Sequence, residues 1–287
     1  MAVVGTRPVP RRVGVDAAIM TPMPAAVAIT RDVSPALAGC ELTFQDRVPI
    51  DVAVARAQHG AYERALAGAG YRVEHLEADA SMPDSVFVED LAVVFDELAI
   101  LTRPGAESRR SEMPAIAAAL APYRSLQSIE APGTVDGGDV LVAGKTVFVG
   151  RSTRTNAAAV AQMRRILAPF GFVVIETAVR QCLHLKSAVT ALDDRRLLVN
   201  PEWIDAAAFD GFELIAVPAD EPAAANVLRL ADRIVAARAF PRTADRLGLL
   251  GLRVERVEAG ELAKAEGAVT CCSLLVQGSG FKVRGTR

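Results

Sequence analysis

The sequence predicts an α/β fold of the propeller type, with five ββαβ units arranged in a ring around a central channel. Two observations predict this fold. A unit made of a short apolar strand, a hairpin, a second strand, an Ala-rich helix and a third strand recurs along the chain. Each copy also opens with a polar residue, and successive openings lie 47, 48, 42 and 45 residues apart. The opening residues are Glu89, Asp136, His184, Asn226 and Cys271.

The first two units carry the clearest pattern. The first contains the strands FVEDLAVVF and LAILTRP and ends on YRSLQSIE. The second contains DGGDVLVAG and TVFVGRS and ends on FVVIET. Its helix places Val160, Met163 and Leu167 on one face, as in a helix that packs on one side. Helices are expected over residues 111–120, 156–167, 204–209 and 243–250.

The fifth unit is split between the two ends of the chain. Its first strand is TCCSLLV near the C-terminus, and its remainder is a strand at 28–30, a helix over 52–66 and the strand YRVEHLE. Pairing of the two parts would close the ring, so truncation at either end should destabilise all of it. In a closed ring the opening residues would lie on the innermost strands and converge on the channel.

The composition indicates a globular protein and excludes several functions. Of 287 residues, 51% are hydrophobic and 23% are charged, which suffices for a sizeable core. The formal net charge is −2 and basic residues are interspersed with acidic ones, so no nucleic-acid-binding face is expected. No apolar run reaches the roughly 20 residues of a membrane span. We expect residues 27–287 to form one catalytic domain and residues 1–26 a flexible extension, although a transit-type leader or an over-long gene start would look similar.

The four cysteines indicate a reducing, cytoplasmic environment, because their spacing suits neither a disulfide framework nor a metal site. Cys271 and Cys272 are adjacent. On a strand they would point to opposite faces, one toward the channel and the other toward the packing layer. A free cysteine is often only a small buried apolar residue, but the register of Cys271 with the other opening residues favours a nucleophile.

His184 and Asp136 suit acid–base chemistry. A lone histidine on a strand is commonly structural, and Asp-Gly is also a hairpin signal. Gly137 and Gly138, however, would permit close backbone approach. An acid beside them, in register with His184, could accept a hydrogen bond from the imidazole and determine its charge and tautomer.

Glu89 and Asp90 are paired carboxylates inside an apolar segment, which is costly unless a cation or hydrogen-bond donors compensate. This pattern favours a guanidinium or ammonium substrate. Arginines that follow the second strands of the first two units could bind a carboxylate bidentately over the channel. They are Arg103, Arg109, Arg110, Arg151 and Arg154.

Six ordered motifs resemble those of the dimethylarginine dimethylaminohydrolase family, one of the guanidino-group-modifying α/β-propeller (pentein) enzymes. The motifs are VFVED, TRPG-x-x-SRR, DGGDVL, VG-x-S-x-RTN, HLKS and TCCS-x-L, and the resemblance extends over about residues 28–276. It implies a cysteine hydrolase, a dimethylargininase, that converts asymmetric dimethylarginine or monomethylarginine to citrulline. Dimethylamine or methylamine would leave, and an S-alkylthiouronium would be the covalent intermediate.

The resemblance also implies roles for residues around the reacting guanidinium. Cys271 would be the nucleophile and His184 the general acid/base. Asp136 would orient His184 and help to hold the guanidinium. Asp90 would bind the guanidinium nitrogens, with support from Glu89.

At the amino-acid end of the substrate, the resemblance implies that Asp84 and the backbone around Glu266 bind the α-ammonium. Arg109 and Arg154 would bind the α-carboxylate, and Leu42 would belong to a lid loop. No metal and no organic cofactor is implied. The expected partner is the small methylated arginine, with no nucleic acid and no membrane, and the protein would be a monomer or a homodimer.

One departure from the wider superfamily bears on the substrate. Arginine deiminases and amidinotransferases have His-x-Asp where this chain has His184-Leu185-Lys186, so the acid that binds unsubstituted guanidinium nitrogens is missing. This favours an N-methylated guanidinium. The alternatives are an arginine deiminase, an amidinotransferase-like enzyme, or a propeller that only binds a ligand. A binding module would have no reason to keep the nucleophile, the histidine and the acids together.

Overall fold

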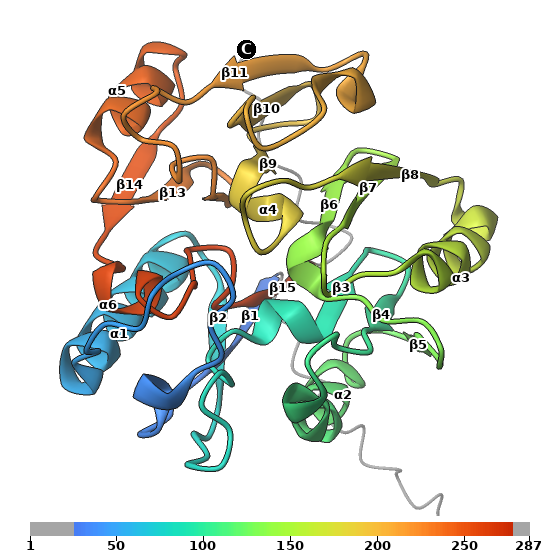
Figure 1. Cartoon of the computed structure of the whole chain (residues 1–287), viewed down its shortest axis with the longest axis horizontal. Coiled ribbons are helices and arrows are strands. Elements are labelled where there is room, and N and C mark those ends of the chain that lie inside the picture. The colour runs from blue at the N-terminus through green and yellow to red at the C-terminus, as the bar shows by residue number, and fades with distance from the viewer. Residues whose placement is uncertain (1–25, 278–287) are drawn as a thin grey trace, which may run out of the picture.

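Five three-stranded sheets surround a central axis in the computed structural model, which describes residues 26–277 (Figure 1). In every sheet the middle strand runs antiparallel to the inner strand and parallel to the outer one. The predicted propeller of five ββαβ units is therefore confirmed. The extension expected over residues 1–26 lies, except for Ala26, outside the described residues.

Four of the sheets are continuous in sequence. The first is β3 (Ala92–Val94), β4 (Ala99–Leu101) and β5 (Leu126–Ser128), with α2 (Met113–Leu120) before its last strand. The second is β6 (Val140–Ala143), β7 (Thr146–Arg151) and β8 (Val173–Ala178), with α3 (Ala157–Leu167) and η5 (Ala168–Phe170). The third is β9 (Val189–Ala191), β10 (Arg196–Val199) and β11 (Glu213–Ala216), with η6 (Ala206–Phe209). The fourth is β12 (Val227–Arg229), β13 (Ile234–Ala237) and β14 (Val254–Val257), with α5 (Pro241–Leu249), and α6 (Gly260–Ala263) follows it.

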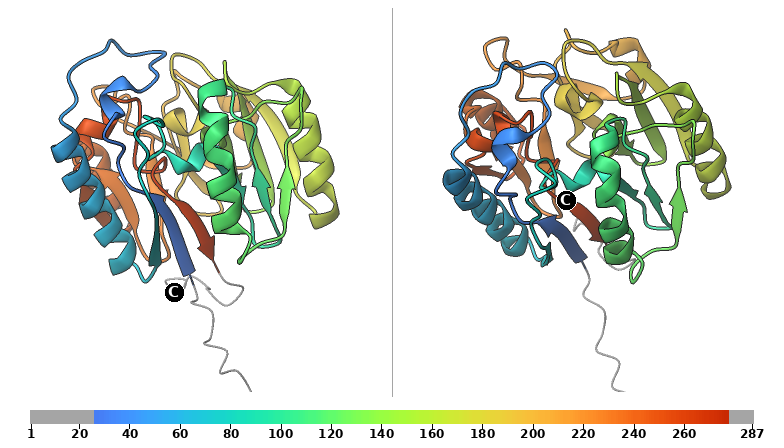
Figure 2. Two further views of the ribbon diagram at one scale, coloured as in Figure 1. Left: turned by 90° about the horizontal axis from the view of Figure 1, so that it is seen from below. Right: turned by 60° about the horizontal axis from the view of Figure 1, so that its bottom comes forward.

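The fifth sheet joins the two ends of the described chain, as the split repeat predicts. β15 (Leu274–Gln277) runs antiparallel to β1 (Ala26–Arg31), and β1 runs parallel to β2 (Arg72–Leu76) after α1 (Val52–Gly68). Both views in Figure 2 show β1 and β15 side by side. η1 (Leu37–Gly39) and a long loop connect β1 to α1.

Helix boundaries follow local capping chemistry. The Asp51 side chain accepts hydrogen bonds from the N–H groups of Ala53 and Val54, and this starts α1. Asn156 does the same for the N–H of Ala159 at the start of α3.

Apolar packing closes the ring, because one buried cluster lies at each of the five junctions between neighbouring sheets. For example, Ile100 of the first unit packs in one cluster with Val147 and Met163 of the second unit. At the next junction, the rings of Phe148 and Phe209 lie 4.6 Å apart, centroid to centroid. The remaining clusters join the third sheet to the fourth, the fourth to the fifth, and the fifth to the first. Loss of one sheet would expose two of these clusters to water.

The polar opening residues precede the inner strands, which corrects the expectation that they lie on them. Glu89 and Asp90 belong to the one-turn helix η2 (Val88–Leu91), and Asp136 directly precedes η4 (Gly137–Asp139). His184 directly precedes α4 (Leu185–Ala188), and Cys271 lies in a turn before β15. The apolar residues of each inner strand pack between sheets, so the polar groups gather at one end of the channel, where each strand begins.

Candidate active site

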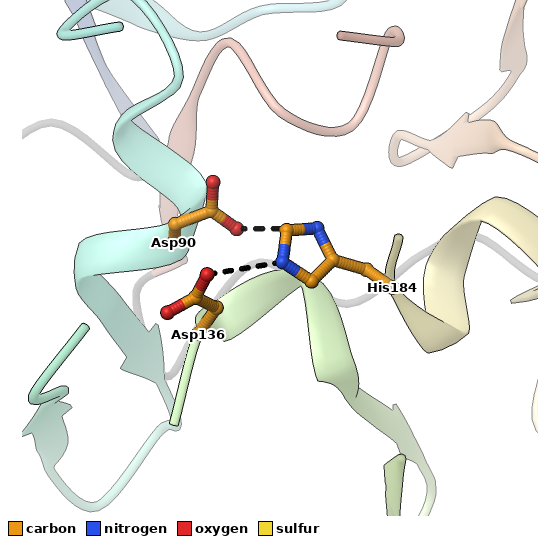
Figure 3. Close-up of side chains that lie close together, drawn as sticks. All are labelled: Asp90, Asp136 and His184. Carbon is orange, nitrogen blue, oxygen red and sulfur yellow. Dashed lines mark hydrogen bonds and ion pairs between the residues drawn. The ribbon is translucent and has the colours of Figure 1, made fainter. Parts of the chain in front are cut away.

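His184 faces two carboxylates, Asp90 and Asp136, that come from different units (Figure 3). Its Nε2 is 3.0 Å from Oδ2 of Asp136, and its Nδ1 is 3.8 Å from Oδ1 of Asp90. All three side chains are buried. The other oxygen of Asp136 accepts a hydrogen bond from the N–H of Gly105 at 2.8 Å, which holds the carboxylate in place.

Two glycines allow this close approach, as the Asp-Gly-Gly-Asp motif suggests. A Cβ on Gly137 would meet the carbonyl oxygen of Glu89 at 1.9 Å. A Cβ on Gly138 would lie 2.6 Å from Nδ1 of His184. The N–H of Gly138 also donates to Oδ1 of Asp90 at 3.0 Å. The motif is therefore not a hairpin turn but the point at which η2, η4 and His184 come together.

The surrounding carboxylates keep His184 protonated. Burial by itself lowers the pKa of this imidazole, but the negative charges of Asp90, Asp136 and Asp139 outweigh burial and raise the pKa to about 9. At neutral pH the free site therefore presents an imidazolium, a form that can donate a proton.

Asp139 was not among the expected site residues, although it is the second acid of the same motif. Its Oδ1 accepts the N–H of Leu185 at 2.9 Å, which fixes the start of α4 directly after His184. Its Oδ2 accepts the hydroxyls of Ser152 and Thr155. Burial raises the pKa of Asp139 to about 6.

Arg109 is placed differently from a free loop arginine. Its Nη1 donates to Oδ2 of Asp90 at 2.6 Å, its Nε to Glu112 at 3.0 Å, and its Nη2 to the carbonyl of Phe87 at 2.8 Å. The reason is the helix η3 (Glu107–Glu112), which turns Arg109 inward and places Glu112 three residues further on the same side. Arg109 thus binds Asp90 in this structure, and its contact with a substrate carboxylate remains a prediction.

Both carboxylate oxygens of Glu89 are bound by neighbouring side chains. Its Oε1 is 2.5 Å from Nζ of Lys186, and its Oε2 accepts the hydroxyl of Thr270 at 2.7 Å. Asn226 donates to the same hydroxyl at 2.9 Å. Burial raises the pKa of Glu89, and the Lys186 charge opposes that rise. The opening residue of the fourth unit, Asn226, thus helps to fix the Thr270 hydroxyl that binds Glu89.

The two adjacent cysteines have different surroundings, but not because of strand alternation, since both lie in the turn before β15. Cys272 is 1% exposed and packs in the apolar cluster beside α1. Cys271 is partly exposed, and its Sγ accepts the N–H of Ala268 at 3.4 Å. Its carbonyl accepts the N–H of Glu89, which ties this turn to η2. Desolvation, followed by the charges of Glu89 and Asp90, raises the pKa of Cys271 to about 12.

A loop over residues 40–50 contributes Glu41 to a small cavity that Asp90, Asp136 and His184 also line, and we call it the lid loop. It contains Leu42, which packs against the apolar cluster beside α1. Glu266 binds this loop through its side chain: the carboxylate accepts the N–H groups of Thr43, Phe44 and Gln45. Glu266 also has a left-handed backbone, with φ of 58°. Sequence reasoning expected only its backbone to matter.

The remaining expected residues, Asp84 and Arg154, line one small cavity together with Asp90, Asp136 and His184. Burial raises the pKa of Asp84 to about 6, although Arg109 opposes the rise. The structure therefore brings Asp84, Asp90, Asp136, His184, Arg109 and Arg154 to one cavity. Three other arginines that the sequence suggested lie elsewhere: Arg103 donates to the carbonyl of Gly133, Arg110 pairs with Glu107, and Arg151 pairs with Glu176.

One group among the described residues has the spacing of a metal site. The ligand atoms of Asp90, Asp136 and His184 all lie within 4.8 Å of one another. The imidazole already shares a short contact with Asp136, however, and the pKa of Asp90 is lowered because His184 and Arg109 outweigh its burial. We interpret the group as an acid–base site.

Solved structures with this architecture define the class. A cysteine-to-serine mutant of dimethylarginine dimethylaminohydrolase from Pseudomonas aeruginosa, complexed with citrulline, matches with a TM-score of 0.81 and 36% identity. The match covers 86% of this chain and 98% of that one. The N-terminal domain of ArgZ, a cyanobacterial arginine dihydrolase, shares the fold with a TM-score of 0.79 at 17% identity. Fold and site thus define a hydrolase of the pentein class.

Sequence relatives narrow the class further. The model of the family described as N,N dimethylarginine dimethylhydrolase, eukaryotic, matches residues 43–239. The chain is 42% identical over 255 residues to the N(G),N(G)-dimethylarginine dimethylaminohydrolase of Streptomyces coelicolor, covering 88% of this chain and 97% of that protein. It is 38% identical over 226 residues to the enzyme of the same name from Pseudomonas aeruginosa, covering 78% and 89%. The chain belongs to the dimethylarginine dimethylaminohydrolase family.

Proposed function

We propose that this protein hydrolyses Nω-methylated arginine to citrulline, with release of dimethylamine or methylamine. The observation that carries the proposal is His184 in contact with Asp136 and Asp90, next to Glu89, whose N–H donates to the carbonyl of Cys271, in a chain 42% identical to a named dimethylarginine dimethylaminohydrolase. All the proposed catalytic groups come from the ring formed by residues 26–277, which supports a single catalytic domain over 27–287.

The first step is attack by the Cys271 thiolate on the guanidinium carbon. The pKa of this thiol, about 12, keeps it protonated at neutral pH. A guanidinium bound by Asp90 would place a positive charge beside the sulfur and lower that pKa, so the thiol would release its proton to solvent and the substrate would promote its own attack. Glu89, the residue next to Asp90, would support Asp90 in this role.

His184 then acts as acid and as base. As an imidazolium it donates a proton to the leaving amine when the tetrahedral adduct collapses to the S-alkylthiouronium. The neutral imidazole next accepts a proton from water, which attacks the same carbon, and the thiol is regenerated as citrulline forms. Asp136 orients the ring through both steps.

The amino-acid end of the substrate would occupy the cavity under the lid loop. Asp84 and the backbone near Glu266 would bind the α-ammonium, and Arg154, with Arg109 in the same cavity, the α-carboxylate. Leu42 would cover this end. Two solved dimethylarginine dimethylaminohydrolases support this class of ligand: one is a cysteine-to-serine mutant complexed with citrulline, and another is a histidine-to-glycine variant in an adduct with S-methyl-L-thiocitrulline.

We also propose a cytoplasmic location and a monomer or homodimer. All four cysteines are free thiols. Over residues 26–277, no helix combines the length and the apolar character that crossing a membrane requires.

The experiment compares wild type, Cys271→Ser and the matched variant Cys272→Ser on asymmetric dimethylarginine, monomethylarginine and arginine. Citrulline should appear with dimethylamine or methylamine, turnover should vanish in Cys271→Ser, and Cys272→Ser should retain it. Citrulline and ammonia from arginine alone would assign the protein to the deiminases instead. Equal loss in both variants would remove Cys271 from the nucleophile's role.

A further inference from the structure

The arginine proposed to bind the substrate carboxylate already binds a carboxylate of the protein. Nη1 of Arg154 lies 3.4 Å from Oε2 of Glu41, and Nη2 lies 3.3 Å from the hydroxyl of Thr43. Both partners belong to the lid loop. Glu41 is 113 residues from Arg154 in sequence, so the contact is purely tertiary.

Glu41 is held in this position from three directions. The hydroxyl of Ser108 donates to its Oε1, in addition to the ion pair with Arg154. Its backbone N–H donates to both carboxylate oxygens of Asp84, at 3.3 and 3.2 Å. The two groups assigned to the substrate's α-ammonium and α-carboxylate, Asp84 and Arg154, therefore both contact Glu41.

The space that remains is far too small for an amino acid. The cavity lined by Glu41, Asp84 and Arg154 has a volume of about 30 Å³. Sites for small molecules usually measure roughly 300–1,000 Å³. The lid loop must therefore move, and the Glu41 carboxylate must leave Arg154, before a substrate can bind there.

We propose that Glu41 is an internal competitor for the α-carboxylate at Arg154, displaced when substrate or product binds. The inference rests on the proposed function, because it uses the assignment of Arg154 to the carboxylate end. One carboxylate replaces another at the same guanidinium, so part of the binding free energy is spent on displacing Glu41. Substrate and product carry the same α-carboxylate, and Glu41 weakens the binding of both by the same factor.

The test is the affinity for citrulline, measured by titration calorimetry on proteins that carry Cys271→Ser. Glu41→Gln keeps the shape of the side chain and removes its charge, and it should bind citrulline up to about fivefold more tightly, the range of a partly exposed ion pair. The matched control is Asp46→Asn, which removes an exposed acid of the same loop and should leave the affinity unchanged.

A second pair of variants separates competition from a general effect on the loop. In an Arg154→Gln background, Glu41→Gln should no longer change the affinity, because no guanidinium remains to compete for. Weaker or unchanged binding of Glu41→Gln would overturn the proposal, as would an equal gain with and without Arg154. Turnover of methylarginine is assayed separately on the protein with its cysteine. If methylarginine is not turned over but the effect of Glu41→Gln still depends on Arg154, only the proposed function is refuted. If methylarginine is turned over but the effect of Glu41→Gln does not depend on Arg154, only the role of Glu41 as a competitor is refuted.

Discussion

Substitution of Asp136 by Asn should lower the pKa of His184 by about one pH unit. The variant keeps an oxygen that can accept from Nε2 but loses the negative charge 3.0 Å away. An opposite charge within about 4–6 Å shifts a pKa by roughly 1–3 units, and the low end applies here because Asp90 and Asp139 continue to stabilise the imidazolium. One pH unit corresponds to about 1.4 kcal/mol. Asp90 and Asp139 remain, so the pKa should stay above its ordinary value.

The lower pKa of His184 in Asp136→Asn should also change how the free energy of unfolding depends on pH. The pKa of His184 rises from 6.5 to about 9 on folding, which corresponds to about 3 kcal/mol. Because the folded value is the higher one, this stabilisation is complete below pH 6.5 and is lost as the pH rises through 9. Asp84 and Asp139, with pKa values of about 6, titrate at lower pH, and Cys271, at about 12, titrates at higher pH.

Two measurements check this reasoning. Nitrogen-detected NMR titration of the three histidines gives the pKa of His184, and denaturant unfolding at pH 6.5 and 9 gives the loss of stability. Wild type should lose about 1 kcal/mol more than Asp136→Asn between these two pH values. The control is Asp210→Asn, an exposed acid after η6, which should behave as wild type. An unchanged imidazole pKa in Asp136→Asn, or an equal fall in the control, would refute the assignment.

Two further substitutions test the packing of the site. Gly138→Ala should reduce turnover about 100-fold while the protein still unfolds cooperatively, because the added methyl would lie 2.6 Å from the catalytic imidazole and displace it. The control Gly248→Ala, where a methyl would meet no atom within 4 Å, should keep full activity. Equal activities of the two variants would show that Gly138 does not position the imidazole. Lys186→Met should lower the free energy of unfolding by about 3 kcal/mol because it leaves Glu89 buried without its cation. The double variant Glu89→Gln/Lys186→Met should recover most of that loss in denaturant titrations, and no recovery would show that the pair is not the cause.

The ring itself could be predicted because its units repeat. Each inner and middle strand is a short apolar run between turns, and the pattern recurs often enough to identify even the unit split between the two ends. The helix expected over residues 204–209 of the third unit is the least regular one, since the structure forms only the short 3-10 helix η6 (Ala206–Phe209) there. Helix α2 begins at Met113 rather than at 111, because the preceding turn is the 3-10 helix that directs Arg109 inward.

The site was predicted by residue type but not by geometry. A polar residue before an apolar run looks like the first residue of a strand, and only the backbone shows the short helical turn that η2 and α4 insert there. Contacts such as Glu266 with residues 43–45, or Glu41 with Arg154, join segments more than 100 residues apart. No local pattern encodes such pairs, so the lid loop could be expected only by resemblance, and its contacts not at all.

The hydrogen bonds of the paired carboxylates favour a methylated guanidinium over free arginine. Both oxygens of Glu89 are engaged, by Lys186 and Thr270, and both oxygens of Asp90 are engaged, by Arg109 and Gly138. Each oxygen therefore keeps only about one of its two lone-pair sites, which leaves fewer acceptors than free carboxylates would offer to the five N–H groups of an unsubstituted guanidinium. Each buried N–H left without an acceptor costs about 1–3 kcal/mol. A dimethylated nitrogen has no N–H to satisfy, so a methylated guanidinium avoids this cost.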